Sequence, residues 1–218
     1  MGDDIQLSKS NTAYFAPEFT DEQVLSAILN SGLNFTRQSD IALYAAEKIA
    51  AKKIIGWYQG KMEGGPRALG NRSILADPRD IKIKDKINTS IKNRERWRPF
   101  GLTILFEHVP NYICPVGPAD FMIVTYQATE RARKDIPATV HIDGTVRPQA
   151  ICKDTNSIFH SLISHFYRKT GVPAVLNTIY NKNNEPIVCT PEDAVRSFCS
   201  MPLDILCIGN YAVTKSER

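Results

Sequence analysis

The fold is decided by the stretch Gly60-Lys-Met-Glu-Gly-Gly-Pro-Arg-Ala-Leu-Gly-Asn-Arg-Ser73, in which four glycines lie among lysine and arginine. It follows an apolar run, residues 54–58, that is typical of a buried strand. Glycine lets the backbone bend sharply and approach a ligand. Lysine and arginine supply positive charge, and the planar fork of arginine matches phosphate or carboxylate oxygens. A strand followed by such a loop predicts an anion site, and we favour phosphate; a tight turn with solvated charges is the alternative.

The loop matches neither of two familiar phosphate-binding patterns, because the chain contains no Gly-x-x-x-x-Gly-Lys-Ser/Thr and the loop is not Gly-x-Gly-x-x-Gly. Its charge is nevertheless distinctive. Residues 61–98 hold eleven Lys/Arg against five Asp/Glu, whereas the whole chain has a net charge of only +4. Such a patch suits a nucleotide or nucleic acid. In the alternative interpretation, the lysines simply solvate one helix face: Lys82, Lys84, Lys86 and Lys92.

The longer stretch Lys61-Met-Glu-Gly-Gly-Pro-Arg-Ala-Leu-Gly-Asn-Arg-Ser-Ile-Leu-Ala-Asp-Pro-Arg79 resembles the signature of the NodU/CmcH carbamoyltransferases, in their C-terminal, YrdC-like domain. Later stretches agree in order, and the resemblance runs from about Tyr14 to about Val213. They are Arg94-Glu-Arg-Trp-Arg-Pro-Phe100, His141-Ile-Asp-Gly-Thr-Val-Arg-Pro-Gln149, Leu176-Asn-Thr-Ile-Tyr-Asn181 and Asn184-Glu-Pro-Ile-Val-Cys-Thr-Pro-Glu-Asp193.

The alternation of short strands and helices predicts an α/β fold with an open, mixed sheet. The resemblance likewise implies a YrdC-like open twisted mixed sheet flanked by helices. We expect a single domain over residues 14–218, preceded by a disordered or frayed N-terminus, residues 1–13.

Capping signals predict several helices. Thr20 and Gln23 form a capping box, Asn156 or Ser157 begins a helix that ends at Thr170, and Thr190 begins one that ends at Ser200. Further helices are predicted over 40–52, capped by Ser39, over 81–93, and in a short turn starting at Pro66. The strands are predicted at 54–58, 102–106, 121–126, 139–142, 146–151, 173–177, 205–208 and 211–213.

The resemblance implies a domain that binds ATP and carbamoyl phosphate and forms carbamoyl adenylate. The catalytic set carried over is Lys61, Arg72, His141 and Arg147. The set that binds nucleotide or carbamoyl phosphate is Arg67, Asn71, Ser73, Arg94, Arg98, Asp143, Asn177 and Asn181. The lysine and arginines of the loop would hold phosphates, and His141 with Arg147 would orient the carbamoyl group. No protein metal ligand is expected; Mg²⁺ would be held through ATP oxygens and water.

The residues themselves leave alternatives open. One predicted hairpin carries His141, Asp143 and Arg147, which either form a ligand site or stabilise the turn. The 94–100 segment has two interpretations. In one, an arginine reaches a phosphate while the aromatic residues are buried; in the other, the arginines form surface ion pairs with Glu95. Asn177 and Asn181 end a strand and would face a ligand or hold a turn.

The family usually has serine where this chain has Ile179, which cannot donate a hydrogen bond. The sequence therefore leaves two functions open: an enzyme domain that adenylates carbamoyl phosphate, and a non-catalytic nucleotide-binding or docking module. In the family, a separate N-terminal domain, joined in cis or met in trans, passes the carbamoyl group to a hydroxyl of a sugar or natural product. RNA binding is disfavoured, because the basic patch lacks interleaved exposed aromatics.

Five scattered cysteines without a Cys-x-x-Cys pair are typical of a reduced, cytoplasmic protein. No apolar run reaches the roughly 18 residues that a membrane span requires. The N-terminus lacks the basic and apolar regions of a signal peptide.

Overall fold

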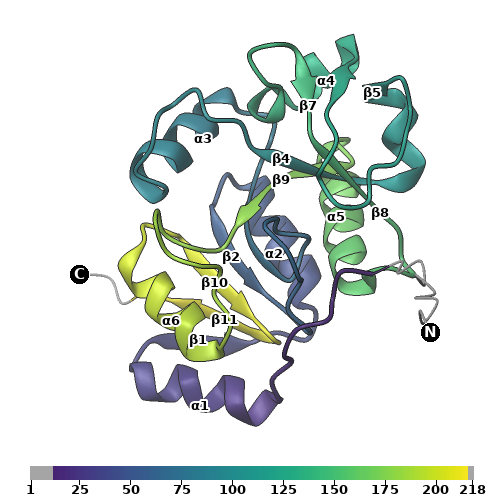
Figure 1. Ribbon diagram of the computed structural model, residues 1–218. Helices are drawn as coiled ribbons and strands as arrows, with labels where there is room; N and C mark the ends of the chain where they lie inside the picture. The colour runs from purple at the N-terminus through teal and green to yellow at the C-terminus, as the bar shows by residue number, and fades with distance from the viewer. Residues whose placement is uncertain (1–11, 216–218) are drawn as a thin grey trace, which may run out of the picture.

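The computed structural model describes residues 12–215, which are built around an eight-stranded mixed sheet (Figure 1). Two neighbouring pairs, residues 205–208 with 55–58 and 101–105 with 148–151, are parallel, and the other pairs are antiparallel. The expected mixed sheet is thus confirmed. In spatial order its strands are β1 (Asn34–Arg37), β11 (Tyr211–Thr214), β10 (Ile205–Ile208), β2 (Ile55–Tyr58), β3 (Arg72–Ala76), β9 (Ala174–Ile179), β4 (Gly101–Leu105) and β8 (Pro148–Ile151).

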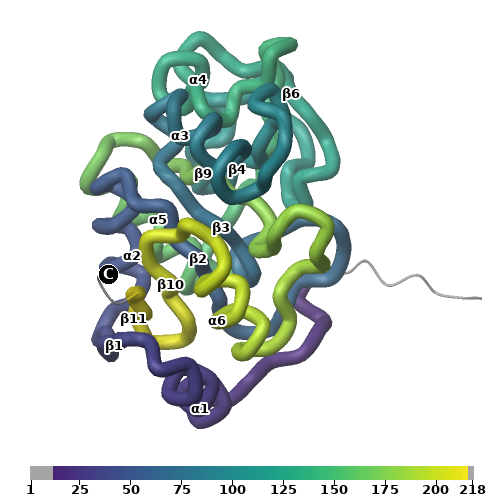
Figure 2. Tube along the Cα trace, turned by 90° about the vertical axis from the view of Figure 1, so that its left-hand side faces the viewer, coloured from purple at the N-terminus to yellow at the C-terminus, as the bar shows by residue number. Residues whose placement is uncertain are grey.

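A second, three-stranded sheet consists of β5 (Ile113–Cys114), β6 (Tyr126–Ala128) and β7 (Thr145–Val146). Figures 1 and 2 place this sheet, with α4, at the opposite end of the molecule from α1. The helices are α1 (Asp21–Ser31), α2 (Ile41–Ala50), α3 (Ile81–Lys86), α4 (Glu130–Asp135), α5 (Ser157–Thr170) and α6 (Pro191–Ser200). A π-helical turn, η1 (Ile87–Ile91), continues α3, and 3₁₀ turns are η2 (Phe106–Asn111) and η3 (Pro137–Thr139).

The central strands of the large sheet are buried on both faces, because helices cover each side. Helices α2 and α5 pack together over one face, and α1 and α6 over the other. Side chains alternate between the two cores with the period of a strand: Trp57 and Leu75 join the α2–α5 core, whereas Tyr58 and Ile74 join the α1–α6 core. This double burial explains why the central strands read as continuous apolar runs.

Three of the predicted helix caps are confirmed. Thr20 and Thr190 each form a complete capping box, and Asn156 rather than Ser157 caps α5. One cap was predicted wrongly: Asp40, not Ser39, accepts the hydrogen bond from the backbone amide of Leu43 at the start of α2. The predicted helix over 81–93 divides into α3 and the π-helical turn η1.

Some of the predicted elements are wrong. Residues 66–70 form no helix; the chain instead enters strand β3, which the sequence did not indicate. Residues 121–125 form no strand, because Met122 has a φ of 54° and the apolar side chains after it are exposed. Residues 139–142 form no strand, because the turn η3 ends at Thr139, and residues 139–151 form no hairpin, since β7 and β8 belong to different sheets with Arg147 between them.

Within residues 12–215, no helix combines the length and the apolar character that a membrane span needs. All five cysteines of the chain lie in this range and are free thiols. Residues 1–11 of the predicted frayed N-terminus lie outside the described residues.

Candidate functional site

The glycine loop is organised around a buried carboxylate. The Oε1 atom of Glu63 accepts hydrogen bonds from the backbone amides of Leu69, Asn71 and Arg72, at 2.7, 3.2 and 3.1 Å. Gly70 has a φ of 106°, and a Cβ there would lie 2.1 Å from the ring of Phe159. The sequence therefore needs glycine at this point to let α5 approach the loop.

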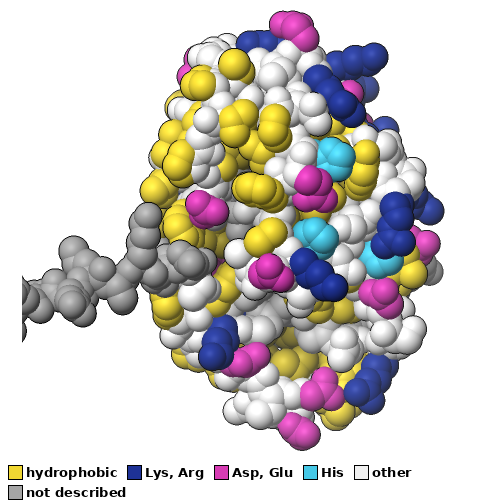
Figure 3. Space-filling view, turned by 90° about the vertical axis from the view of Figure 1, so that its right-hand side faces the viewer, with side chains coloured by type: hydrophobic (Ala, Val, Ile, Leu, Met, Phe, Trp, Pro, Cys, Tyr) yellow, Lys and Arg dark blue, Asp and Glu magenta, His cyan; other side chains and the backbone are white. Residues whose placement is uncertain are grey.

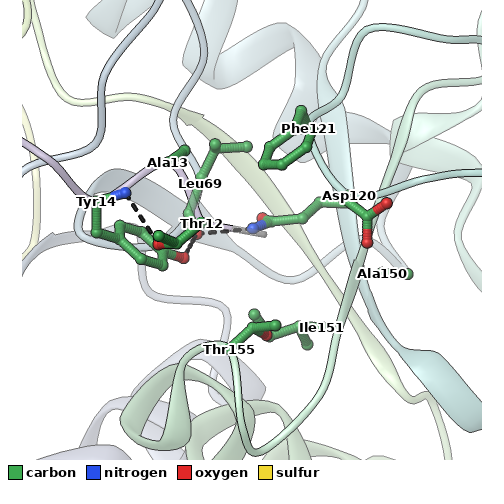
Figure 4. Close-up of a pocket in the computed structure, with 10 residues that line it drawn as sticks. Thr12, Ala13, Tyr14, Leu69, Asp120, Phe121, Ala150, Ile151 and Thr155 are labelled. Carbon is green, nitrogen blue, oxygen red and sulfur yellow. Dashed lines mark hydrogen bonds between the residues drawn. The ribbon is translucent and has the colours of Figure 1, made fainter. Parts of the chain in front are cut away.

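Residues 13–17, which we call the N-terminal strap, close the loop from outside. The amide of Gly64 donates to the carbonyl of Ala13 at 2.7 Å, and Met62 exchanges two backbone hydrogen bonds with Ala16 and Pro17. The hydroxyl of Tyr14 donates to the carbonyl of Leu69 at 2.8 Å, and burial raises the pKa of this phenol to about 12. Figure 4 shows Ala13, Tyr14 and Leu69 beside a small cavity of about 30 Å³.

A row of polar side chains on three adjacent strands holds the far end of the loop. Asn177 on β9 donates to the carbonyl of Ala68 at 3.2 Å and to the hydroxyl of Thr103 on β4 at 3.0 Å. That hydroxyl donates to Gln149 on β8, whose amide donates to the carbonyl of Leu69 at 2.8 Å. The sheet thereby fixes the backbone on the C-terminal side of Arg67.

Three arginines meet at this edge of the sheet: Arg67 from the loop, Arg94, and Arg147 from the junction of β7 and β8. Burial, together with the positive charges of Arg67 and Arg94, lowers the pKa of Arg147 to about 10. The buried Nε atoms of Arg67 and Arg147 have no hydrogen-bond partner within the described chain. None of the three forms an ion pair with an acidic residue in residues 12–215. We call this group the arginine cluster.

The arginine cluster contrasts with ordinary surface charge. On the face shown in Figure 3, hydrophobic side chains gather on one side and basic and acidic groups are interspersed over the rest. Positive groups that are partly buried together without acids repel one another, and an anion bound between them relieves that repulsion. The cluster is therefore suited to hold a ligand with several negative charges.

His141 lies beside this cluster. Its Nδ1 atom is 3.0 Å from the hydroxyl of Thr145, and its Nε2 atom is 3.4 Å from the carbonyl of Phe100. Burial lowers the pKa of His141, and the charge of Arg147 lowers it further, so the imidazole is neutral at pH 7. Asp143 is exposed and caps the turn through the amide and hydroxyl of Thr145. Its carboxylate acts within the turn.

Arg72 lies in a different environment from the one predicted. Its side chain is fully buried and stacks on the ring of Tyr58, with the guanidinium carbon 3.6 Å from the ring centroid. The guanidinium donates to the carbonyls of Gln59, at 2.7 Å, and of Gly60 and Asn71. These bonds occupy both terminal nitrogens of the guanidinium, and its buried Nε has no partner within the described residues. The geometry gives Arg72 a structural role.

Lys61, Asn71 and Ser73 are not brought to the arginine cluster. Lys61 is exposed and lines a cavity of about 320 Å³ with Lys153, which lies in the turn before α5. Asn71 is buried, donates to the carbonyl of Lys61 at 2.7 Å and accepts from Asn156 at 2.8 Å. Ser73 lies inside β3, and its buried hydroxyl has no partner in the described chain.

Lys92 is a residue that sequence reasoning assigned to a solvated helix face. Its ammonium group is buried and donates to the carbonyl of Ile179 at 2.6 Å and to the carbonyl and side chain of Asn181 at 2.9 and 2.7 Å. Burial, together with the charge of Arg94, lowers the pKa of Lys92 to about 7. Asn181 is thus held by lysine, and its own side-chain amide donates to the carbonyl of Glu185 at 2.6 Å. The only sequence signal for its burial was that Lys92 directly follows Ile91, the last residue of the apolar stripe.

The 94–100 segment differs from its prediction in one respect. Phe100 is buried, but Trp97 is 61% exposed. Arg94 donates from Nε to the side chain of Asn88 at 2.7 Å, and its guanidinium faces the ring of Phe100 at 4.9 Å. Arg98 is exposed, and its guanidinium carbon lies 6.0 Å from the Trp97 ring centroid.

Comparison with known proteins is consistent with this architecture. Residues 46–215 match the family model described as "Carbamoyltransferase C-terminus". The chain is 38% identical over 221 residues to the nodulation protein NolNO of Sinorhizobium fredii, covering 99% of this chain and 32% of that protein. It is 40% identical over 208 residues to the nodulation protein NolO of Bradyrhizobium diazoefficiens, covering 93% and 38%.

Two solved structures share the fold at low identity. One is full-length HypF in its phosphate- and nucleotide-bound form, with a TM-score of 0.56 and 16% identity, over 82% of this chain and 26% of that one. The other is a variant of Sua5 from P. abyssi, with a TM-score of 0.54 and 14% identity, over 78% and 45%. The chain spans about a third of the length of the curated relatives named above. By its sequence and its fold, the chain belongs to the family of carbamoyltransferase C-terminal domains.

Proposed function

We propose that this domain activates carbamoyl phosphate with ATP to form carbamoyl adenylate. A separate N-terminal domain, joined in cis or met in trans, then transfers the carbamoyl group to a hydroxyl of a sugar or natural product. The observation that carries the proposal is the arginine cluster, which has positive charge, buried unpaired Nε atoms and no acidic partner within the described residues. Family membership points to the carbamoyl group as the cargo.

The proposed step consumes ATP, carbamoyl phosphate and water, and it gives carbamoyl adenylate, pyrophosphate and phosphate. Water releases the phosphate and leaves a carbamate. A carbamate oxygen then attacks the α-phosphorus, and the bond to the bridging oxygen of the leaving pyrophosphate breaks. Negative charge builds on phosphate oxygens, so positioning and fixed positive charge are the main contributions of the protein. Arg67, Arg94 and Arg147 supply that charge, and neutral His141 orients the carbamoyl end.

The residues present fit a nucleotide. The unpaired Nε atoms of Arg67 and Arg147 are donors, and the unpaired Oδ1 of Asn177 is an acceptor. Residues 12–215 contain no group of three or more His, Cys, Asp or Glu side chains that could hold a metal. We propose that Mg²⁺ enters with ATP and is held by phosphate oxygens and water. Free thiols are compatible with a cytoplasmic location.

A second candidate function is a nucleotide-binding or docking module that does not turn over. One observation favours it: Ile179 presents only its backbone carbonyl to Lys92, and its side chain offers no hydrogen bond where the resembled family has serine. The loss of one neutral hydrogen bond from a site costs about 0.5–1.5 kcal/mol, which weakens a site without abolishing it. We therefore favour the enzyme.

The test is release of pyrophosphate by the full chain supplied with ATP, carbamoyl phosphate and Mg²⁺. We expect release to require both substrates and to fall at least about 100-fold in Arg147→Gln, since a lost charge-stabilising group has an effect of this size. Arg37→Gln is the matched control, because Arg37 is exposed in β1 and contacts Asp21 at 3.8 Å.

Each other outcome is informative. Equal rates in Arg147→Gln and wild type would overturn the assigned site. Binding of ATP without release of pyrophosphate would favour the non-catalytic module. Absence of both binding and release would overturn the proposed function.

A further inference from the structure

Trp97 is an exposed aromatic side chain that core packing does not explain. It is 61% exposed, whereas the other tryptophan, Trp57, is fully buried. The one ring contact of Trp97 in the described chain is the guanidinium of Arg98, at 6.0 Å. A large apolar ring left in water on a loop is a common mark of a binding surface.

The backbone that carries this ring is fixed on both sides. The side-chain amide of Asn88, which is fully buried, donates to the carbonyls of Arg96 and Arg98 at 3.1 and 3.0 Å. These two residues bracket Trp97. The carbonyl oxygen of the same side chain accepts from the Nε of Arg94 at 2.7 Å. One asparagine therefore couples the position of the exposed ring to the position of an arginine in the cluster.

Asn88 lies in the π-helical turn η1, an irregular geometry that is frequent at functional sites. The result is a ring whose backbone is immobilised in advance while its faces remain accessible. Such preorganisation lowers the entropy lost when a ligand binds.

Positive charge leads from the ring into the site. Arg98 contacts the ring; burial and then the charge of Arg98 lower the pKa of Arg94, and burial and then the charges of Arg67 and Arg94 lower that of Arg147. An aromatic face at one end of a row of guanidinium groups matches a molecule with a flat base at one end and phosphates along its length. Nucleotides have this shape.

We propose that Trp97 is the platform on which the purine base of the nucleotide stacks, with its phosphates directed along Arg94 toward Arg147. The proposal rests on the proposed function, because it takes the arginine cluster as the phosphate site. It adds the residue that distinguishes a nucleotide from a simple phosphate.

The experiment uses the full chain with ATP and, separately, pyrophosphate, each with Mg²⁺, and measures dissociation constants by calorimetry. We expect Trp97→Ala to weaken ATP binding about tenfold, the size typical of one base stacked on an aromatic ring. Pyrophosphate affinity should stay unchanged. Trp97→Phe, which keeps an aromatic face, should bind ATP within about threefold of wild type. Arg147→Gln should weaken both ligands.

Fluorescence gives an independent reading. Because Trp57 is buried, acrylamide quenches mainly Trp97, and ATP but not pyrophosphate should protect it. Unchanged ATP affinity in Trp97→Ala would overturn the platform while leaving the arginine cluster intact. The platform would also be overturned if Trp97→Ala weakened binding to another protein and left the affinity for ATP unchanged. If wild type bound neither ATP nor pyrophosphate, the platform and the proposed function would both fail.

Discussion

Arg72 and Arg147 are both partly or fully buried arginines, yet their surroundings are opposite. Both terminal nitrogens of Arg72 donate to backbone carbonyls, whereas Arg147 lies beside two further positive charges; the Nε of each lacks a partner within the described residues. The sequence presents both as arginines within family motifs and cannot tell them apart. The direction of a side chain depends on contacts with residues far along the chain, which no local pattern reveals. The sequence did identify Arg67, Arg94, Arg147 and His141, which the fold brings together.

The contrast predicts opposite mutant behaviour. Arg72→Met should lower the free energy of unfolding by about 3 kcal/mol, because buried carbonyls lose their donors. Arg147→Gln should leave that free energy within about 1 kcal/mol of wild type, since it removes a repelled charge, while abolishing pyrophosphate release. Urea unfolding and the release assay measure the two effects. If Arg147→Gln but not Arg72→Met destabilised the fold, the assigned difference between the two arginines would be contradicted.

Lys92 predicts a specific pH dependence of stability. Its pKa is about 7 in the folded chain against an ordinary value of 10.5. Between these values the unfolded chain binds a proton that the folded chain does not, so this group makes the folded state more stable as pH rises from 7 toward 10.5. From pH 7.5 to 9.5, wild type should gain on the order of 2 kcal/mol relative to Lys92→Met.

Urea midpoints at the two pH values measure this difference. Lys86→Met, on the exposed side of α3, is the control and should keep the wild-type slope. Equal slopes in wild type and Lys92→Met would show that the ammonium group remains charged when folded.

Among the elements, those with local chemical signals were predictable. Thr20, Asn156 and Thr190 marked helix starts, because a side chain that accepts a backbone amide acts within three residues. Strand β3 was missed, since its first residues, Arg72 and Ser73, read as part of the loop. Its pairing with β2 and β9 comes from distant parts of the chain. Long-range pairing overrode local preference there.

The contact between the loop and α5 gives an element-scale prediction. Gly70→Ala should destabilise the fold by about 3 kcal/mol, because a methyl group would meet the ring of Phe159 and the residue must also adopt a positive φ. Gly171→Ala, with φ of 75° and open space around it, should cost only about 1 kcal/mol for the backbone strain. Thermal unfolding compares the two. Equal losses would mean that Phe159 moves aside readily.

For the whole molecule, two hydrophobic cores share one sheet. Trp57 points into one core while its neighbour Tyr58 points into the other, so neither core can open without disturbing the strand between them. We therefore expect a single cooperative transition. In Trp97→Phe, fluorescence of Trp57 and far-ultraviolet circular dichroism should give one coincident urea curve. Two separated midpoints would show that the cores unfold independently.

The N-terminal strap has a mechanical consequence. Three backbone hydrogen bonds join Ala13, Ala16 and Pro17 of the strap to Met62 and Gly64 of the loop. A force applied to the strap therefore reaches the glycine loop before it reaches the sheet. Displacement of the strap and the shape of the loop are thus mechanically coupled.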